Sequence, residues 1–359
     1  MIFERAARRE FSHAAAGVFV ALFAILISTQ MIRLLAEAAG GKLAPEAVAA
    51  ILGFAALNYL PVLLSLTLFM AILLPMSRAY RDSEMVVWSA SGLPLTAWLL
   101  PVFRFSLPIV TAVATLSFFL SPWAISQSNE YRNRLDARND ASLVTPGIFQ
   151  EVNSGRRVVF VERLSEDAIS VQNVFMTTVE EGRLGVIVAD SGRQEIMPDG
   201  SRFLVLSKGR RYEAEPGTPE FRMMEFEQYG ARLFDQDVKE LDASPRAMPF
   251  WELLQDDAPR AKGELVWRLG LPLSTLLLAF LAVPLSFVNP RAGRSMNMLF
   301  AILLFSLYNN LLSITQAWVA RDHLSWGAAL LLPHALMLAI LMVLFFHRLR
   351  RFATLSLRP

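Results

Sequence analysis

The sequence predicts a helical membrane protein that carries an all-β domain inserted between its third and fourth transmembrane helices. Two observations support this fold class. Three long apolar segments precede, and three follow, a polar stretch of about 140 residues that is typical of β-strands. In addition, 54% of the 359 residues are hydrophobic and only 18% are charged, and the mean hydropathy is +0.41. Soluble proteins have about 45–50% apolar and about 25% charged residues.

Six apolar segments are long enough to cross a membrane, because a bilayer core of about 30 Å requires about 20 apolar residues in a helix. We expect these helices at Ala14–Leu35, Val48–Met76, Leu95–Ile125, Leu265–Val288, Met296–Val319 and Trp326–Phe346. The first segment could instead be a signal peptide, since Ala36 and Ala38 form an Ala-x-Ala sequence typical of a cleavage site. Its apolar run exceeds the length of a signal-peptide core, which favours a retained helix.

Arginine and lysine are distributed unequally over the two sides of the predicted membrane domain. One side contains the two termini and two loops, with Arg5, Arg8, Arg9, Arg78, Arg81, Arg291, Arg294, Arg348, Arg350, Arg351 and Arg358, whereas the short loops opposite contain Lys42 and Arg321. Cytoplasmic loops carry the excess of basic residues. Both termini are therefore expected in the cytoplasm and the polar insert outside, and these basic clusters are read as topology signals, with no nucleic acid expected as a partner.

We expect three parts in the chain: residues 1–125 with helices one to three, the β-domain with flanking helical segments at 126–263, and residues 264–359 with helices four to six. Gln127–Asn139 extends the third span, and Trp251–Leu254 forms a short amphipathic helix leading back to the membrane. The β-runs, separated by turn residues, are expected at Gly147–Val152, Arg157–Glu162, Val171–Met176, Leu184–Ala189, Ser201–Leu206, Arg211–Glu215 and Arg222–Tyr229. Their spacing is typical of a sandwich, barrel or jellyroll.

Several chemistries lack their usual residues. The chain has no cysteine, and its four histidines (His13, His323, His334 and His347) are far apart, so we expect no metal site and no thiol chemistry. No Gly-x-Ser-x-Gly sequence marks a nucleophile, and we expect no catalytic residues. No Gly-x-x-x-x-Gly-Lys-Ser/Thr sequence occurs, so any ATP and Mg²⁺ are expected on a separate subunit.

A short helix is predicted in the loop between the second and third spans, at about residues 82–92. Asp82 and Ser83 are residues that cap a helix start, and Gly92 followed by Pro94 stops it. This helix is either a surface connector or an element that docks into a groove of a cytoplasmic partner.

Several sequence stretches, taken in order, resemble the LptF/LptG family of lipopolysaccharide export permeases. They are Met1–Glu10, Arg81–Met85 with Ser91-Gly92, Pro146–Gly155, Gly209–Glu213, Glu264–Ser274 and Ala282–Arg294. The last stretch resembles the F type more than the G type, which remains the alternative. The resemblance covers nearly the whole chain.

The resemblance implies a non-catalytic permease subunit of an ABC transporter in the inner membrane of Gram-negative bacteria. It implies a periplasmic jellyroll-like domain, a G-type permease partner, a dimeric cytoplasmic ATPase, a periplasmic jellyroll bridge protein and a membrane-anchored C-type subunit. Such a complex extracts lipopolysaccharide and passes it toward the outer membrane, and the first and fifth spans line the permease interface.

The resemblance also assigns roles to particular residues. It likens the loop helix to a coupling helix that contacts the ATPase, with Arg81, Asp82, Glu84, Met85 and Trp88 as the candidate residues. The candidates for lipid binding are Arg33, Arg268, Phe149 and Phe160. The two arginines could contact lipid phosphates or simply extend to the membrane surface. A membrane-anchored scaffold without a lipid path, and a membrane-embedded hydrolase, are the alternatives of other classes.

Overall fold

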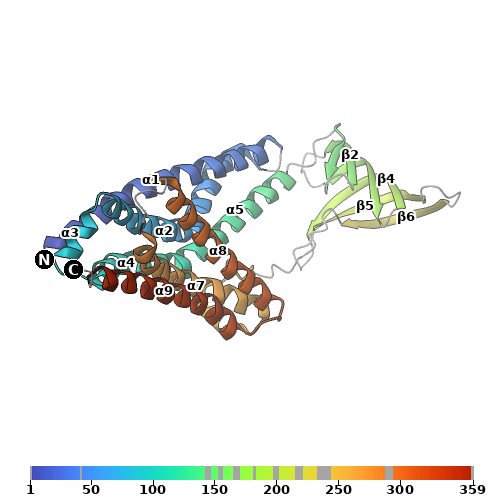
Figure 1. The fold of residues 1–359 in the computed structure, drawn as a ribbon. Helices are drawn as coiled ribbons and strands as arrows, with labels where there is room; N and C mark the ends of the chain where they lie inside the picture. Colours follow the sequence, from blue (N-terminus) through green and yellow to red (C-terminus); the bar gives the residue numbers. More distant parts are fainter. Residues whose placement is uncertain are drawn as a thin grey trace. The chain divides into compact units, whose positions relative to one another are not determined.

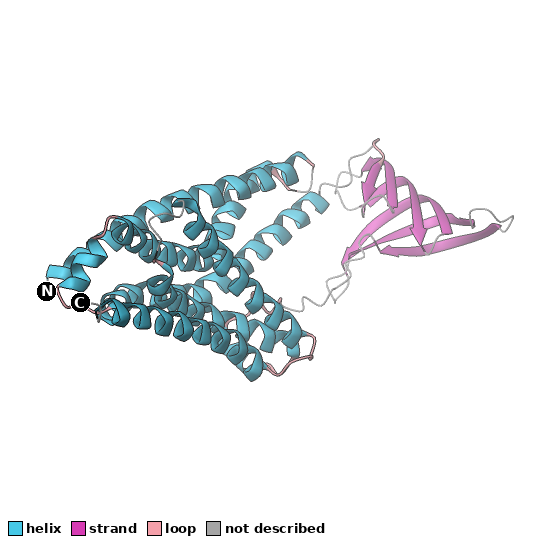
Figure 2. Cartoon of the chain, viewed as in Figure 1, coloured by secondary structure: helices cyan, strands magenta, loops and turns pink. Residues whose placement is uncertain are grey.

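The computed structural model describes residues 2–40, 43–141, 147–152, 157–164, 170–180, 183–196, 202–214, 221–232, 244–287 and 294–356. The chain divides into two compact units, one of helices (residues 1–130 and 243–359) and one containing the β-strands (residues 131–242). Figure 2 shows this division between helix and strand. Two of the predicted β-runs, Ser201–Leu206 and Arg211–Glu215, extend by one residue each, Ser201 and Glu215, outside the described residues.

The helical unit contains six spans of transmembrane length and composition, which confirms the predicted fold class. They run over Glu4–Ala39, Pro45–Arg81, Leu95–Arg132, Pro259–Leu285, Met298–Ala320 and Trp326–Leu349. The helices are α1 (Ile2–Ala39), α2 (Val48–Arg81), α3 (Glu84–Ala90), α4 (Leu99–Thr115), α5 (Ser121–Ala141), α6 (Phe250–Gln255), α7 (Pro259–Leu285), α8 (Arg294–Ala320) and α9 (Trp326–Ser356). Two 3₁₀ turns, η1 (Pro45–Ala47) and η2 (Leu95–Trp98), precede α2 and α4, and a π-helical turn, η3 (Leu116–Leu120), joins α4 to α5.

Helices α2 and α7 form the centre of the helical unit. In α2 and in α7, about two thirds of the most apolar stretch is buried inside the protein. In α1, none of the corresponding stretch is buried. The core between them contains Leu68, Phe69, Ile72, Leu278 and Leu281, all fully buried. The N-terminal end of α1, the C-terminal end of α9 and the short helix α3 lie at the same end of this unit (Figure 1).

The β-unit contains one antiparallel sheet in which the six described strands follow one another in sequence order. They are β1 (Gln150–Val152), β2 (Arg157–Leu164), β3 (Ser170–Glu180), β4 (Arg183–Ile196), β5 (Arg202–Ala214) and β6 (Phe221–Arg232). One face buries an apolar core that includes Val161, Val174, Met176, Ile187 and Leu206. Two of the strands predicted separately, Ser201–Leu206 and Arg211–Glu215, are one strand, β5.

The long strands bend without losing their pairing. Asn173 in β3 and Lys208 in β5 have positive φ angles of 52° and 50°, which are uncommon for residues other than glycine. The pairing of β5 with β4 has the same register on both sides of Lys208. At Asn173 the alternation of faces shifts by one residue, so that Val171 and Val174 are both buried. These bends keep the apolar core on one face along the whole sheet. The bend at Lys208 explains why the sequence there predicted a turn between two separate strands.

Close contact between α7 and α8 depends on a glycine. A Cβ atom at Gly263 would lie 2.8 Å from the carbonyl oxygen of Gln316 and 3.1 Å from the Cβ of Ala320. We predict that Gly263→Ala separates the two helices and lowers the free energy of unfolding by about 1–3 kcal/mol, the usual cost of overpacking. Gly53→Ala in α2 is the control, because nothing lies within 4 Å of the added Cβ. Thermal unfolding in one detergent checks this, and equal melting temperatures for the two variants would contradict it.

Candidate functional site

The first candidate site is the short helix α3, which follows α2 after a tight reversal. Ser83 precedes α3 with φ of 60° and makes no side-chain capping hydrogen bond, so the predicted capping role of this residue is wrong. The predicted stop at Gly92 is confirmed. Gly92 has φ of 87°, its N–H donates to Ser89 O at 3.0 Å, and the N–H of Leu93 donates to Trp88 O at 3.1 Å. This is the glycine-dependent hydrogen-bonding pattern of a Schellman motif.

Charged side chains connect α3 to two other helices. The Arg78 guanidinium, near the end of α2, lies 2.7 Å from a carboxylate oxygen of Glu10 in α1 and 3.7 Å from one of Glu84 in α3. Arg81 and Asp82 form a further pair at 3.8 Å. These side chains are 41–48% exposed, so each pair contributes little to stability. Their consequence is geometric, because the start of α3 is linked through Arg78 to α1.

The apolar side chains of α3 divide between two faces. Met85 is buried and Trp88 is half-buried against the core of the helical unit. Val86 and Val87 are 64% and 68% exposed. Of the predicted partner contacts, Glu84 is thus at the surface, whereas Met85 faces the chain's own core. Val87 also lies on the outward face, although it was not among the residues predicted to contact a partner. A helix of seven residues is too short for hydrophobic periodicity to show which face is outward.

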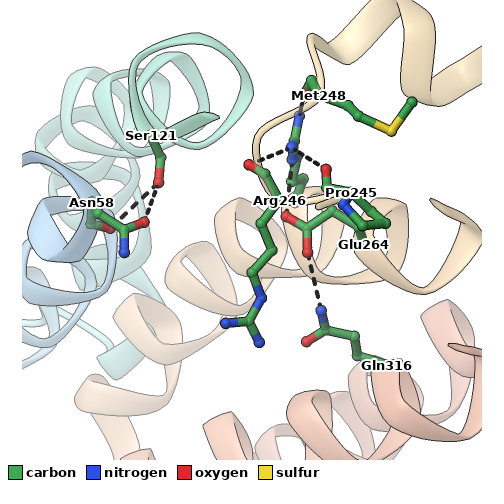
Figure 3. Close-up of polar contacts among 8 residues, drawn as sticks. Asn58, Ser121, Pro245, Arg246, Met248, Glu264 and Gln316 are labelled. Carbon is green, nitrogen blue, oxygen red and sulfur yellow. Dashed lines mark hydrogen bonds and ion pairs between the residues drawn. The ribbon is translucent and has the colours of Figure 1, made fainter. Parts of the chain in front are cut away.

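The second candidate site is a buried polar network around Arg268 in α7, shown in Figure 3. Arg268 is 2% exposed. Its Nε donates to Glu264 Oε1 at 3.0 Å, and its terminal nitrogens donate to the carbonyl oxygens of Met248 at 2.9 Å, Pro245 at 2.9 Å and Arg246 at 3.1 Å. Arg268 thereby holds the segment that precedes α6 against α7.

Glu264 extends the network to α8. The Gln316 amide donates from Nε2 to Glu264 Oε2 at 3.1 Å. Both carboxylate oxygens of the buried Glu264 thus have partners, as burial of a charge in a membrane requires. Arg268 was expected to meet lipid phosphate or to extend to the membrane surface. Arg268 does not extend to the surface, and each of its three side-chain nitrogens donates to a group of the chain itself. Its predicted role in lipid binding stays a prediction.

Arg33 is exposed near the end of α1. Its Nε lies 3.4 Å from Glu37 Oε1, one helical turn further on, and its side chain is 59% exposed. The guanidinium is accessible to a lipid headgroup, but the adjacent carboxylate reduces the local positive charge. Its predicted lipid contact stays a prediction.

The predicted aromatic candidates of the β-unit lie together. The Phe149 ring is 4.6 Å from that of Phe160 and 6.1 Å from that of Phe175, centroid to centroid. Phe160 pairs with Phe175 across β2 and β3, and both alternate with the buried positions Val161 and Val174. The aromatic cluster is therefore on the face opposite to the apolar core, and Phe149 is 63% exposed there.

Within the described ranges, no group of three or more His, Asp or Glu side chains is placed to hold a metal ion. The polar residues Arg246, Gln316, Asn58 and Ser121 near the Arg268 network were missed by the sequence reasoning. Single polar residues at the ends of apolar spans are common, and nothing in their spacing indicates that they come together.

The Arg268 network gives a stability prediction. Arg268→Met leaves Glu264 buried without its cation, and breaking a buried pair in this way costs about 3–5 kcal/mol. Arg33→Gln breaks an exposed pair and should cost no more than about 1 kcal/mol. Unfolding by sodium dodecyl sulfate measures both variants, and equal losses would show that the network does not stabilise the helical unit.

Comparison with known proteins agrees with the fold and with the resemblance. Residues 5–347 match the family described as lipopolysaccharide export system permease LptF/LptG. The lipopolysaccharide export system permease proteins LptF of Escherichia coli (strain K12) and of Shigella flexneri are each 31% identical to the chain over 316 residues. The alignment covers 86% of this chain and 84% of each relative. The chain belongs to the LptF/LptG family of lipopolysaccharide export permeases.

Proposed function

We propose that the chain is the F-type permease subunit of an ABC transporter that extracts lipopolysaccharide from the inner membrane and passes it to a periplasmic bridge. The observation that carries this proposal is the similarity to LptF over 86% of the chain. The G-type permease is the alternative within the family. The chain itself is non-catalytic in this proposal.

A second, G-type permease is proposed to pack against the exposed apolar faces of α1 and α8. Val20, Ile25 and Ile32 on α1 are 61–67% exposed, and Leu303 and Leu307 on α8 are 61% and 62% exposed. Lipid covers such faces in a single subunit. Between two permeases, they would form an apolar wall for acyl chains, whose exposure to water costs about 0.8 kcal/mol for each CH₂ group.

The energy source is proposed to be a dimeric cytoplasmic ATPase that binds ATP and Mg²⁺ and contacts α3, while this chain binds no cofactor. The outward side of α3 presents Glu84, Val86 and Val87, an acidic group beside an exposed apolar pair. Short helices with such a face commonly bind in grooves. The excess of arginine at the end of the helical unit that contains α3 supports a cytoplasmic position for this end and for both termini.

The β-unit is proposed to lie in the periplasm as the first section of a conduit toward the outer membrane. With three spans before it and three after it, it lies on the side opposite to the termini if all six helices cross the membrane. Its partners in this proposal are the jellyroll bridge protein and the membrane-anchored C-type subunit.

Glu84→Ala should weaken the association of the ATPase about tenfold, a loss equivalent to about 1.4 kcal/mol. The physical reason is the loss of the only acidic group that the outward face of α3 offers within the described residues. Co-purification of the ATPase with the full chain from membranes measures the effect. Glu46→Ala is the control, because Glu46 is another exposed glutamate at the start of a short helix, η1. Equal ATPase recovery with both variants would contradict the proposed contact.

A photo-crosslinking residue at Arg33 should form lipopolysaccharide adducts that increase with ATP in the assembled complex. Leu331 on α9, which is 68% exposed, is the control for general lipid contact and should show no ATP-dependent increase. In the β-unit, the same probe at Phe226 on the core side and at Phe160 on the opposite side distinguishes which face contacts lipid. Complete absence of adducts at Arg33, Phe160 and Phe226, in a complex that hydrolyses ATP, would favour the scaffold alternative.

A further inference from the structure

A polar cavity of about 200 Å³ lies in the helical unit between α2, the η3–α5 segment, α7 and α8. Its lining includes Asn58, Ser121, Arg246, Glu264 and Gln316. The Ser121 hydroxyl donates to Asn58 Oδ1 at 2.7 Å on one side of it. Figure 3 shows Arg246 extending into the space between this pair and the Glu264–Gln316 pair. The cavity therefore combines hydroxyl, amide and guanidinium donors.

The charges of the cavity do not balance. Its described lining has two cations, Arg246 and Arg268, and one anion, Glu264. Arg268 and Glu264 neutralise each other. Among the described residues, the Arg246 guanidinium makes no hydrogen bond and no ion pair within 4 Å, its electrostatic interaction with Glu264 is longer-range, and its side chain is accessible. The excess of one positive charge favours an anionic ligand, and guanidinium groups match phosphate oxygens in geometry.

An apolar groove of about 600 Å³ lies directly beside the polar cavity. Phe118, Phe119 and Trp123 line one side, and the start of α6 with Phe250 and Trp251 lines the other. The rings of Phe118 and Phe250 are 4.7 Å apart. Phe119, Trp123 and Trp251 are 53%, 50% and 58% exposed, so the groove presents uncovered aromatic surface.

The polar cavity and the apolar groove adjoin at Pro122. Pro122 lines both spaces. Residues next to each other in the chain line different spaces, with Ser117 in the polar cavity and Phe118 in the groove. On the other side, Arg246 lines the polar cavity and Ala247 the groove. The residues of the π-helical turn η3 contribute to both, and such turns occur often at functional sites.

We propose that this site binds one membrane glycerophospholipid, with its phosphodiester at Arg246 and one acyl chain in the aromatic groove. The size of the groove matches one acyl chain, and competition with lipopolysaccharide distinguishes the two lipids. Pockets of about 300–1,000 Å³ suit a ligand of drug size, comparable to one acyl chain, whereas the lipid part of lipopolysaccharide has several chains. The proposal goes beyond lipopolysaccharide export, because it gives the subunit a second lipid that is held and not transported.

The test uses the full-length chain in a neutral detergent with phosphatidylglycerol that carries a photoactivatable diazirine in one acyl chain. We expect labelling of the peptides that contain Phe119, Trp123 or Trp251. Arg246→Gln and Trp251→Ala should each reduce the apparent affinity about tenfold. The matched controls are Arg321→Gln and Trp326→Ala, at exposed positions outside the cavity and groove, and they should leave the affinity unchanged. Melting temperatures establish that all four variants are folded.

Competition identifies the source of the phosphate. Unlabelled phosphatidylglycerol should displace the probe, and purified lipopolysaccharide at the same concentration should not. Equal displacement by lipopolysaccharide would assign the site to the exported lipid and overturn the proposal. Labelling of the folded Arg246→Gln variant at the level of the Arg321→Gln control would also overturn it.

Discussion

The helical unit depends on one buried ion pair near the end at which the chain returns from the β-unit. Arg268 joins α7 to the carbonyl groups of residues 245, 246 and 248, and Glu264 joins the same helix to Gln316 in α8. In a bilayer, an unpaired charge or carbonyl group at this depth would be costly. The pairing therefore fixes how the segment before α6 enters the membrane, and this position in turn forms the polar cavity and the aromatic groove.

The opposite end of the helical unit has a different organisation. Its charged pairs are exposed and weak, and they connect the short helix α3 to α1 through Arg78. Exposed pairs exchange partners at little cost, so a partner that attracts Glu84 could release Arg78 without destabilising the fold. A buried network at one end and an exchangeable surface network at the other are consistent with the proposed function, in which the end that contains α3 contacts a partner.

Much of the fold was predictable from the sequence, because hydrophobic length is a strong signal in a membrane protein. The six spans and the stop of α3 at Gly92 follow from apolar run length and from glycine conformation. The separate strands predicted on either side of Lys208 are one strand, because a single residue with positive φ bends β5 without ending it. The Glu264–Arg268 pair is visible in the sequence as an i,i+4 pair, but its burial was not predictable, since the other acceptors of Arg268 are backbone carbonyl groups that any sequence provides. The face of α3 was not predictable either, because Met85 and Trp88 are distinguished from Val86 and Val87 only by packing against other helices.

The proposed function requires that the chain move lipopolysaccharide as part of an ATP-driven complex. Reconstitution tests it most directly: the full chain, the G-type permease, the ATPase and the C-type subunit are placed in liposomes with lipopolysaccharide, and transfer to the soluble bridge protein is measured. We expect transfer that requires both ATP and this chain. Transfer at the same rate without this chain, or no transfer from a complex that hydrolyses ATP, would contradict it.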